Sequence, residues 1–379
     1  PFTDDLGRSA DYFALAAGNN IDQRVLARAL NDRDTRLALR AIDAVSQVAG
    51  GSTLWEGLEG SRPLVEAMLY PNRRVQYDAA LAVGGALPSE AFAGDERVIP
   101  LLASAVRDVD ARYAQVLSTD QEVYQGVRSV LDAMGYRVLP RYATLTDARD
   151  SIAETPGLDL IVAVTKGSDV EALVDQVRDT PELAATPVLA LVSRTDAAAL
   201  SARYERDALA SVRPISMRAN ELRRAAEVLV EGASGGPITE NEAKAYAARS
   251  LKALRDLAIT GGGSLDPSTA APALINAMND GTAADPMQVA GVLAVIDAEI
   301  AQVALMDQAL AASGSDRVAL LGLTAHSVKR FGARLESRQI DRLIDLVASA
   351  QGDEGTAAAA LAGALGLPND RLLPLIIGD

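Results

Sequence analysis

Apolar side chains recur at helical spacing in two neighbouring stretches near the start of the chain, 30–50 and 69–87. In the first stretch, four small or apolar positions fall on one helical face: Leu37, Ala41, Ala44 and Val45. The second stretch repeats this set at a constant offset (75 − 37 = 38): Val75, Ala79, Ala82 and Val83. A fixed offset of this size is typical of stacked helix pairs, so we predict helical repeats.

Short polar motifs precede both helices, with Asp32 to Asp34 before the first and Pro71 to Arg73 before the second. Polar side chains at such points cap free N–H groups, and Pro71 ends the preceding helix. A third unit begins at 97–106 but is not completed. Its apolar face requires a neighbour: Val98, Leu101, Leu102 and Val106. We expect helices beyond the interruption to cover this face, so that the repeats pack continuously.

The helical period breaks at Ala111, where short apolar runs begin to alternate with amphipathic segments. Five strand-like runs are predicted at 113–118, 136–142, 159–164, 186–193 and 210–215, and a helix-like segment follows each of them. Strict alternation of this kind is typical of a doubly wound parallel sheet. The runs LIVAV and PVLALV are continuously apolar, as expected for strands that helices cover on both faces.

A second helical block follows a short segment rich in glycine and serine. Thr239 and Glu242 have the spacing of a capping box, and Asp285 followed by Pro286 indicates another helix start. Further helical segments continue through 369–377. We predict helical repeats over 1–110, an α/β domain over 111–232, a linker over 233–238, and helical repeats over 239–379. The fold class is therefore mostly α with an α/β insert.

Composition removes several classes of function. The chain of 379 residues has a formal net charge of -15, which disfavours a nucleic-acid-binding surface. It contains no cysteine, which excludes disulfides and thiolate chemistry, and its one histidine, His326, cannot form a histidine metal cluster. No apolar run reaches the roughly 18 residues of a membrane span. Pro1 is not an initiator residue, so we expect a processed or truncated chain.

The paired helices resemble HEAT repeats, most clearly in Pro71–Gly84 and less so in Asp32–Val45. The central domain resembles a response-regulator receiver, with LDLIVAV similar to its third strand, TPVLALVS to its fourth and VRPIS to its fifth. The combined order resembles large HEAT-repeat proteins of planctomycete-type bacteria that carry a degenerate receiver-like insert. That resemblance implies an exported or periplasmic protein, with a cytoplasmic location as the alternative.

The receiver resemblance also implies which positions should carry phosphoryl chemistry. Its acid pair falls on Ser118 and Thr119, its phosphorylated carboxylate on Val164, its hydroxyl on Val192 and its lysine on Arg213. A valine cannot be phosphorylated, and neither Ser118 nor Thr119 can replace a magnesium-binding acid. We therefore expect a pseudo-receiver that is not an enzyme and has no catalytic, metal-binding or cofactor-binding residues.

Two features are candidates for a partner surface. Arginines gather around the fourth helix, fifth strand and fifth helix of the α/β domain: Arg203, Arg206, Arg218, Arg223 and Arg224. Acidic residues interleave with them, so a solvated, salt-bridged surface is the alternative. Trp55 is either an exposed interface anchor or a packing residue over helix ends.

The favoured hypothesis is a scaffold that binds protein partners or itself, without nucleic acid or a membrane span. The alternatives are a self-assembling structural subunit of an exported or envelope assembly and a signalling or phosphorelay component.

Overall fold

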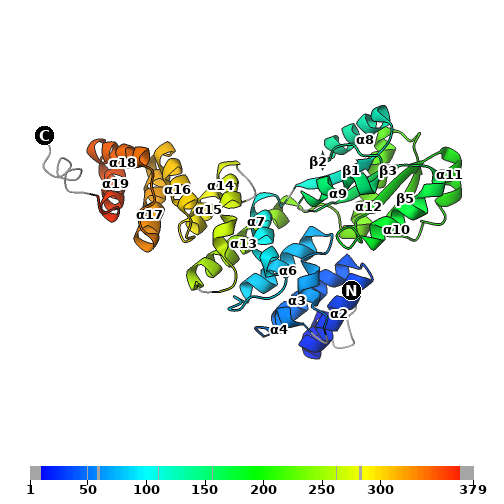
Figure 1. Ribbon diagram of the computed structural model, residues 1–379, viewed down its shortest axis with the longest axis horizontal. Coiled ribbons are helices and arrows are strands. Elements are labelled where there is room, and N and C mark those ends of the chain that lie inside the picture. Colours follow the sequence, from blue (N-terminus) through cyan, green and yellow to red (C-terminus); the bar gives the residue numbers. More distant parts are fainter. Residues whose placement is uncertain are drawn as a thin grey trace. The chain divides into compact units, whose positions relative to one another are not determined.

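The computed structural model describes residues 10–48, 50–57, 60–109, 111–155, 157–261, 263–280 and 284–367. The protein is mostly helical and contains one five-stranded, all-parallel sheet (Figure 1). It forms two compact units, neither of which is continuous in sequence. The first consists of Pro1–Ala86 and Asp110–Glu240, and the second of Leu87–Val109 and Asn241–Asp379. The predicted helical segment at 369–377 lies outside the described residues.

The first unit begins with six helices: α1 (Ala10–Ala17), α2 (Asn19–Asn31), α3 (Thr35–Val48), α4 (Thr53–Glu56), α5 (Pro63–Ala67) and α6 (Arg73–Gly85). The predicted caps are confirmed, because the Asp34 carboxylate accepts the N–H of Leu37 at 3.0 Å and the Asn72 amide oxygen accepts that of Val75 at 3.3 Å. Three of the four positions that periodicity placed on one face of α3 are buried, namely Ala41, Ala44 and Val45, whereas Leu37 is 40% exposed. Ala38 and Ile42 complete the buried face.

The sheet lies in the same unit and has the strand order β2-β1-β3-β4-β5. Its strands are β1 (Arg112–Leu117), β2 (Tyr136–Val138), β3 (Leu160–Val164), β4 (Val188–Val192) and β5 (Ala210–Pro214). All neighbours pair in parallel, as the apolar runs predicted. Five helices separate or follow the strands: α8 (Gln121–Ala133), α9 (Leu145–Ala153), α10 (Val170–Asp179), α11 (Arg194–Leu200) and α12 (Ala219–Ser234).

Helices cover both faces of this sheet, which explains why its central strands are apolar throughout. Leu160 and Val162 of β3 pack in one core with side chains of α8 and α12. Their neighbours Ile161 and Ala163 pack in the other core with α9, α10 and α11. The alternation follows from the two-residue period of a strand, so a fully apolar strand supplies both cores at once.

Two adjacent arginines at the start of α6 join the N-terminal helices to the α/β fold. Arg73, only 6% exposed, donates to both carboxylate oxygens of Asp159 at 3.0 Å, and Asp159 also accepts the N–H of Tyr113 at 2.8 Å. Arg74 donates to the carbonyl oxygens of Gly236 at 2.9 Å and Pro237 at 3.0 Å. The first unit is therefore one folded body built from two sequence segments.

Apart from the short helix η2 (Gly167–Asp169) of the first unit, the remaining helices lie in the second unit. They are η1 (Asp95–Arg97), α7 (Val98–Arg107), α13 (Glu240–Thr260), η3 (Pro267–Ala270), α14 (Ala271–Asp280), α15 (Pro286–Leu293), α16 (Glu299–Ala311), α17 (Gly314–Phe331), α18 (Ser337–Ser349) and α19 (Gly352–Ala364). Asp285 caps α15 through the N–H of Met287 at 3.0 Å, as predicted. Helix α14 was not predicted from the sequence.

Helix α7 packs against η3 and α14, although the whole α/β fold lies between them in sequence. The apolar face of α7 is buried, with Val98, Leu102 and Val106 fully inaccessible to solvent. This confirms that helices beyond the interruption cover that face. Continuous packing of all the repeats stays a prediction.

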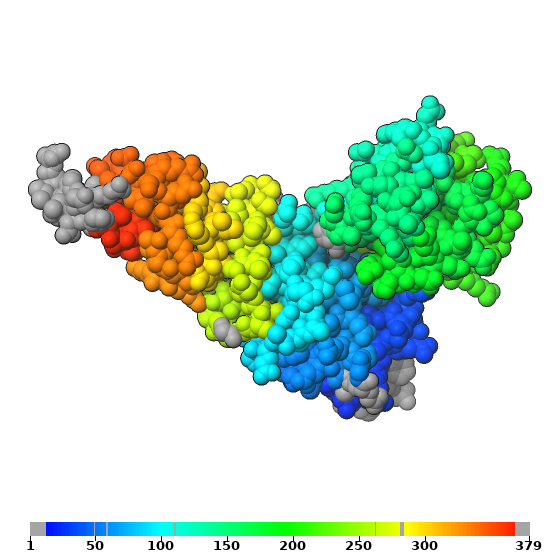
Figure 2. All heavy atoms as spheres, in the orientation of Figure 1, coloured from blue at the N-terminus to red at the C-terminus, as the bar shows by residue number. Residues whose placement is uncertain are grey.

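The last six helices pack as successive pairs: α14 with α15, α16 with α17, and α18 with α19. Each pair also contacts the next, and Figure 2 shows these segments as adjoining bands from yellow to red. Buried Gln302 of α16 holds the connection between α17 and α18, because it donates to the carbonyl of Gly332 at 2.9 Å and accepts the N–H of Arg334 at 3.0 Å. None of the described helices has the length and apolar character needed to cross a membrane.

Candidate functional site

The positions that the receiver resemblance assigned to magnesium binding lie at the carboxyl end of β1. Ser118 is fully buried, and its hydroxyl donates to the carbonyl of Asp120 at 3.0 Å and accepts the N–H of Asp120 at 3.1 Å. Asp120 in turn caps α8, accepting the N–H groups of Glu122 and Val123. The carbonyls of Ser118 and Thr119 both accept from Arg141. These groups therefore hold a turn together.

The other receiver positions lie at the ends of β3, β4 and β5. Val164 is partly buried and packs against the core beneath α8 and α12, and Val192 is buried in the opposite core. Ser193, next to Val192, caps α11 through the N–H of Asp196 at 3.1 Å. Arg213 is exposed and donates weakly to the carbonyl of Val212 at 3.3 Å. Within the described ranges, no three acidic or histidine side chains converge as a metal site would require.

The structure disperses the arginines that the sequence grouped together. Helix α11 ends at Leu200, so Arg203 and Arg206 lie in the turns after it, where Arg203 forms an exposed two-point ion pair with Glu171. Arg218 precedes α12, and its backbone N–H donates to Glu221 at 2.7 Å. Arg224 is an exposed residue of α12. Arg223 alone of this group lines the pocket described next.

Trp55 lies in the short helix α4 and is 8% exposed. This corresponds to the packing alternative for this residue. The sequence did not distinguish the two alternatives, because the surrounding glycines and polar residues are also typical of an exposed loop.

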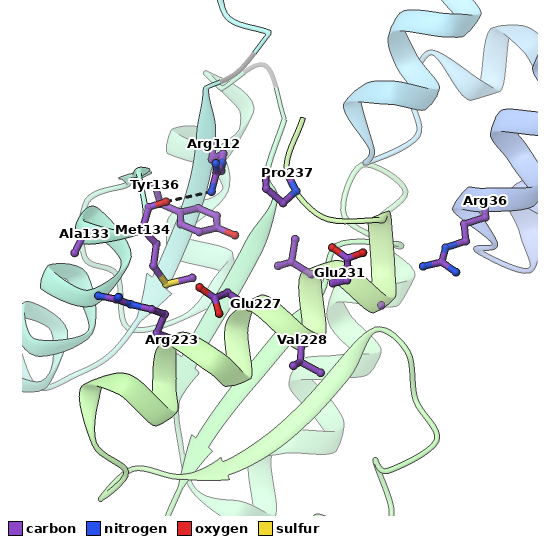
Figure 3. A pocket seen from close by; sticks show the side chains of 12 residues that line it. Arg36, Arg112, Ala133, Met134, Tyr136, Arg223, Glu227, Val228, Glu231 and Pro237 are labelled. Atoms are coloured by element: carbon purple, nitrogen blue, oxygen red, sulfur yellow. Dashed lines mark hydrogen bonds between the residues drawn. The ribbon is translucent and has the colours of Figure 1, made fainter. Parts of the chain in front are cut away.

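A pocket of about 620 Å³ opens at the amino ends of β1 and β2, opposite the carboxyl ends described above (Figure 3). Its walls come from the end of α8, the first residues of β1 and β2, the second half of α12 and the turn that follows it, with Arg36 of α3 at one side. A volume of this size suits a small molecule or a single large side chain.

Local hydrogen bonds build the pocket walls. Arg112 donates to the carbonyl of Met134 at 3.1 Å, and its guanidinium lies 5.9 Å from the centre of the Tyr136 ring. Arg74 holds Pro237 in place by its bond to the Pro237 carbonyl. Gly236 has a positive φ of 81°, and a Cβ at this position would lie 2.3 Å from a carboxylate oxygen of Glu231. The positive φ favours glycine in this turn, whereas the Glu231 side chain could swing away from an added Cβ.

Tyr136 brings an unused polar group to the pocket. It is 6% exposed, and its hydroxyl makes no hydrogen bond to any described residue. Burial raises the pKa of Tyr136 to about 12, and the Asp159 carboxylate adds to the rise, whereas Arg112 opposes it. The hydroxyl stays protonated at neutral pH and can both donate and accept a hydrogen bond.

Charged side chains of both signs surround this hydroxyl. Glu227 and Glu231 are four residues apart on α12, and Figure 3 shows their carboxylates with the Tyr136 hydroxyl around the middle of the pocket. In the same view the guanidinium of Arg223 points away from the middle, and Arg36 lies at the far side. No ion pair within the described residues involves Glu227 or Glu231.

Sequence reasoning missed this pocket almost entirely, with Arg223 its one shared residue. Its lining runs from Arg36 to Pro237, and no local motif marks residues so far apart. The one available signal was Tyr136, an aromatic residue with a polar tip at the start of a strand. No protein-family model matches the chain, and no curated protein is significantly similar to it.

Proposed function

We propose that the protein is a non-enzymatic scaffold that presents helical surfaces and a receiver-like domain to protein partners. The observation that carries this proposal is Val164 at the carboxyl end of β3. Open parallel sheets bind ligands outside the carboxyl ends of their strands, and the order β2-β1-β3-β4-β5 is that of flavodoxin-like folds. A valine at this point offers no nucleophile, and the nearby hydroxyls of Ser118 and Ser193 are bonded to backbone groups of their own turns.

The helical arrangement supports the same proposal. From α14 to α19, each helix pair stacks on the next one in the chain, which is typical of an α-solenoid, and HEAT-like repeats of this kind offer long surfaces to partners. The receiver-like domain then serves as a rigid platform, because Arg73 and Arg74 fasten it to the helices α1–α6.

Two measurements test the proposal. Incubation of the protein with acetyl phosphate and Mg²⁺ should leave its intact mass unchanged, and a stoichiometric phosphoryl gain that hydroxylamine removes would contradict it. Crosslinking in the native cell, followed by mass spectrometry, should recover a defined set of proteins joined to the outer faces of α14–α19 or to the α/β fold. Crosslinks scattered at low yield over the whole surface would argue against a scaffold.

A further inference from the structure

The pocket at the amino ends of β1 and β2 combines three kinds of group that one side chain of a partner can use together. The first is the Tyr136 hydroxyl, which is held in a residue that is 6% exposed and has no hydrogen-bond partner among the described residues. The ring is held by burial while the hydroxyl faces the pocket, so a ligand atom can bond to a hydroxyl that is already oriented.

The second kind of group is negative charge. Glu227 and Glu231 lie one helical turn apart, so their like charges repel each other, and neither forms an ion pair with a described residue. Arg112 lies nearby but is bonded to the carbonyl of Met134, and Arg223 points away from the carboxylates in Figure 3. A cation from outside would bring the two carboxylates an opposite charge that the surrounding arginines do not supply.

The third kind of group is apolar. The side chains of Met134 and Val228 and the ring of Pro237 form walls around the polar centre, and Val228 is 65% exposed. Apolar walls around a charged centre suit a ligand with a hydrocarbon stem and a cationic tip, because the stem covers the walls while the tip stays near the carboxylates.

We propose that this pocket receives a lysine side chain of a protein partner. The aliphatic stem lies along Met134, Val228 and Pro237, the ammonium group lies between Glu227 and Glu231, and the Tyr136 hydroxyl accepts one of its hydrogens. The assignment rests on the proposed scaffold function and adds the chemistry of its partner. The net charge of -15 also favours a basic partner surface, since opposite fields accelerate association.

The test uses the full chain and three capped pentapeptides, acetyl-Ala-Ala-Xaa-Ala-Ala-amide, in which Xaa is lysine, norleucine or glutamate. Norleucine keeps the stem of lysine and lacks its charge. Ligand-observed NMR titration should rank lysine above norleucine and norleucine above glutamate. Because an exposed ion pair contributes up to about 1 kcal/mol, a factor of about five, the lysine peptide should bind about fivefold more tightly than the norleucine peptide.

Variants locate the binding on the protein. Glu227→Gln with Glu231→Gln should remove the preference for lysine over norleucine, and Tyr136→Phe should weaken lysine binding about twofold or more while the ring packing remains. Glu154→Gln with Glu182→Gln changes the net charge equally at two exposed positions outside the pocket and should leave the preference intact. Thermal unfolding of each variant verifies that it is folded before titration.

Several results would overturn the proposal. Equal binding of the lysine and norleucine peptides would show that Glu227 and Glu231 do not bind the ammonium group. Loss of the preference in the remote control variant would show the same. Equal affinity for the lysine peptide and for free lysine amide would mark a small-molecule site instead of a protein-docking site. None of these results bears on phosphoryl transfer or on crosslinked partners, so the scaffold proposal would be judged separately.

Discussion

Arg73 is the residue on which the first unit depends most directly. It sits at the first position of α6, and its partner Asp159 precedes β3, so the pair spans 86 residues of sequence. Burial by itself lowers the pKa of Arg73, but the Asp159 charge and hydrogen bonds outweigh this and leave the pKa raised. The guanidinium is therefore charged, and its removal would leave the Asp159 carboxylate without its cation.

We predict that Arg73→Ala lowers the free energy of unfolding by about 2–4 kcal/mol, slightly below the range for fully buried pairs because Asp159 is 27% exposed. Chemical denaturation measures this change. Arg128→Ala is the matched control, because it breaks an exposed pair with Asp132 within one helix and should have little effect. Similar stability of the two variants would show that Arg73 does not fasten α6 to the sheet.

Asp22 is a second residue whose setting can be tested. It is buried in α2, one of its carboxylate oxygens has no partner among the described residues, and burial raises its pKa. A carboxyl whose pKa is higher in the folded than in the unfolded chain costs stability above both values, and this cost disappears as the pH falls below both.

We therefore expect Asp22→Asn to raise the midpoint of thermal unfolding at pH 7 and to lose this advantage progressively as the pH falls below about 4, the ordinary pKa of aspartyl groups. Asp43→Asn in α3 replaces an exposed aspartate and is the control. An equal effect of Asp22→Asn at pH 7 and at a pH below about 4 would contradict a charged, poorly solvated Asp22.

At the scale of elements, α7 packs against α14 although the whole α/β fold separates them in sequence, so the order of elements does not predict this contact. Leu102 is fully buried in α7, whereas Leu37 of α3 is 40% exposed. We predict that Leu102→Ala lowers the free energy of unfolding by about 2–5 kcal/mol and speeds amide exchange in α14, because it opens a cavity between the two helices. Leu37→Ala should change neither quantity appreciably. Amide exchange in α14 that is the same with and without Leu102→Ala would show that α7 does not pack against α14.

Element boundaries followed the apolar pattern closely in β3 and β4 and less closely elsewhere, since β2 ends at Val138 although the predicted run covered 136–142. The strands β3 and β4 coincide with apolar runs because both faces are covered, which leaves no polar position to blur them. Helix α11 begins at Arg194 and ends at Leu200, earlier than the helical segment predicted near Ala197–Asp207. Ser193 explains the early start, because its side chain caps Asp196, a local bond that periodicity does not reveal.

At the scale of the whole molecule, the second unit takes one helix from before the α/β fold and the rest from after it. We predict that residues 239–379 expressed alone are less stable than the same residues joined to 87–109 through a flexible glycine–serine linker. The linked form covers the face of α14 that α7 occupies, and thermal unfolding measures the difference. Equal midpoints for the two forms would show that α7 adds nothing to this unit.

The sequence by itself determined the kinds of element and their order. Apolar runs and helical spacing are local properties, and they predicted five parallel strands, most of the helices and the helix caps at Asp34, Asn72 and Asp285. It also determined that a valine, Val164, ends the third strand, from which we expect no phosphoryl chemistry at the carboxyl ends of the strands.

The tertiary structure alone decided what these elements do to one another. It paired Arg73 with Asp159, placed α7 on α14, and brought Arg36, Tyr136 and Glu231 to one pocket. These contacts join residues far apart in the chain, and they depend on where the chain turns back on itself. Periodicity shows which face of an element is apolar, but the partner of that face is selected by packing over the whole unit.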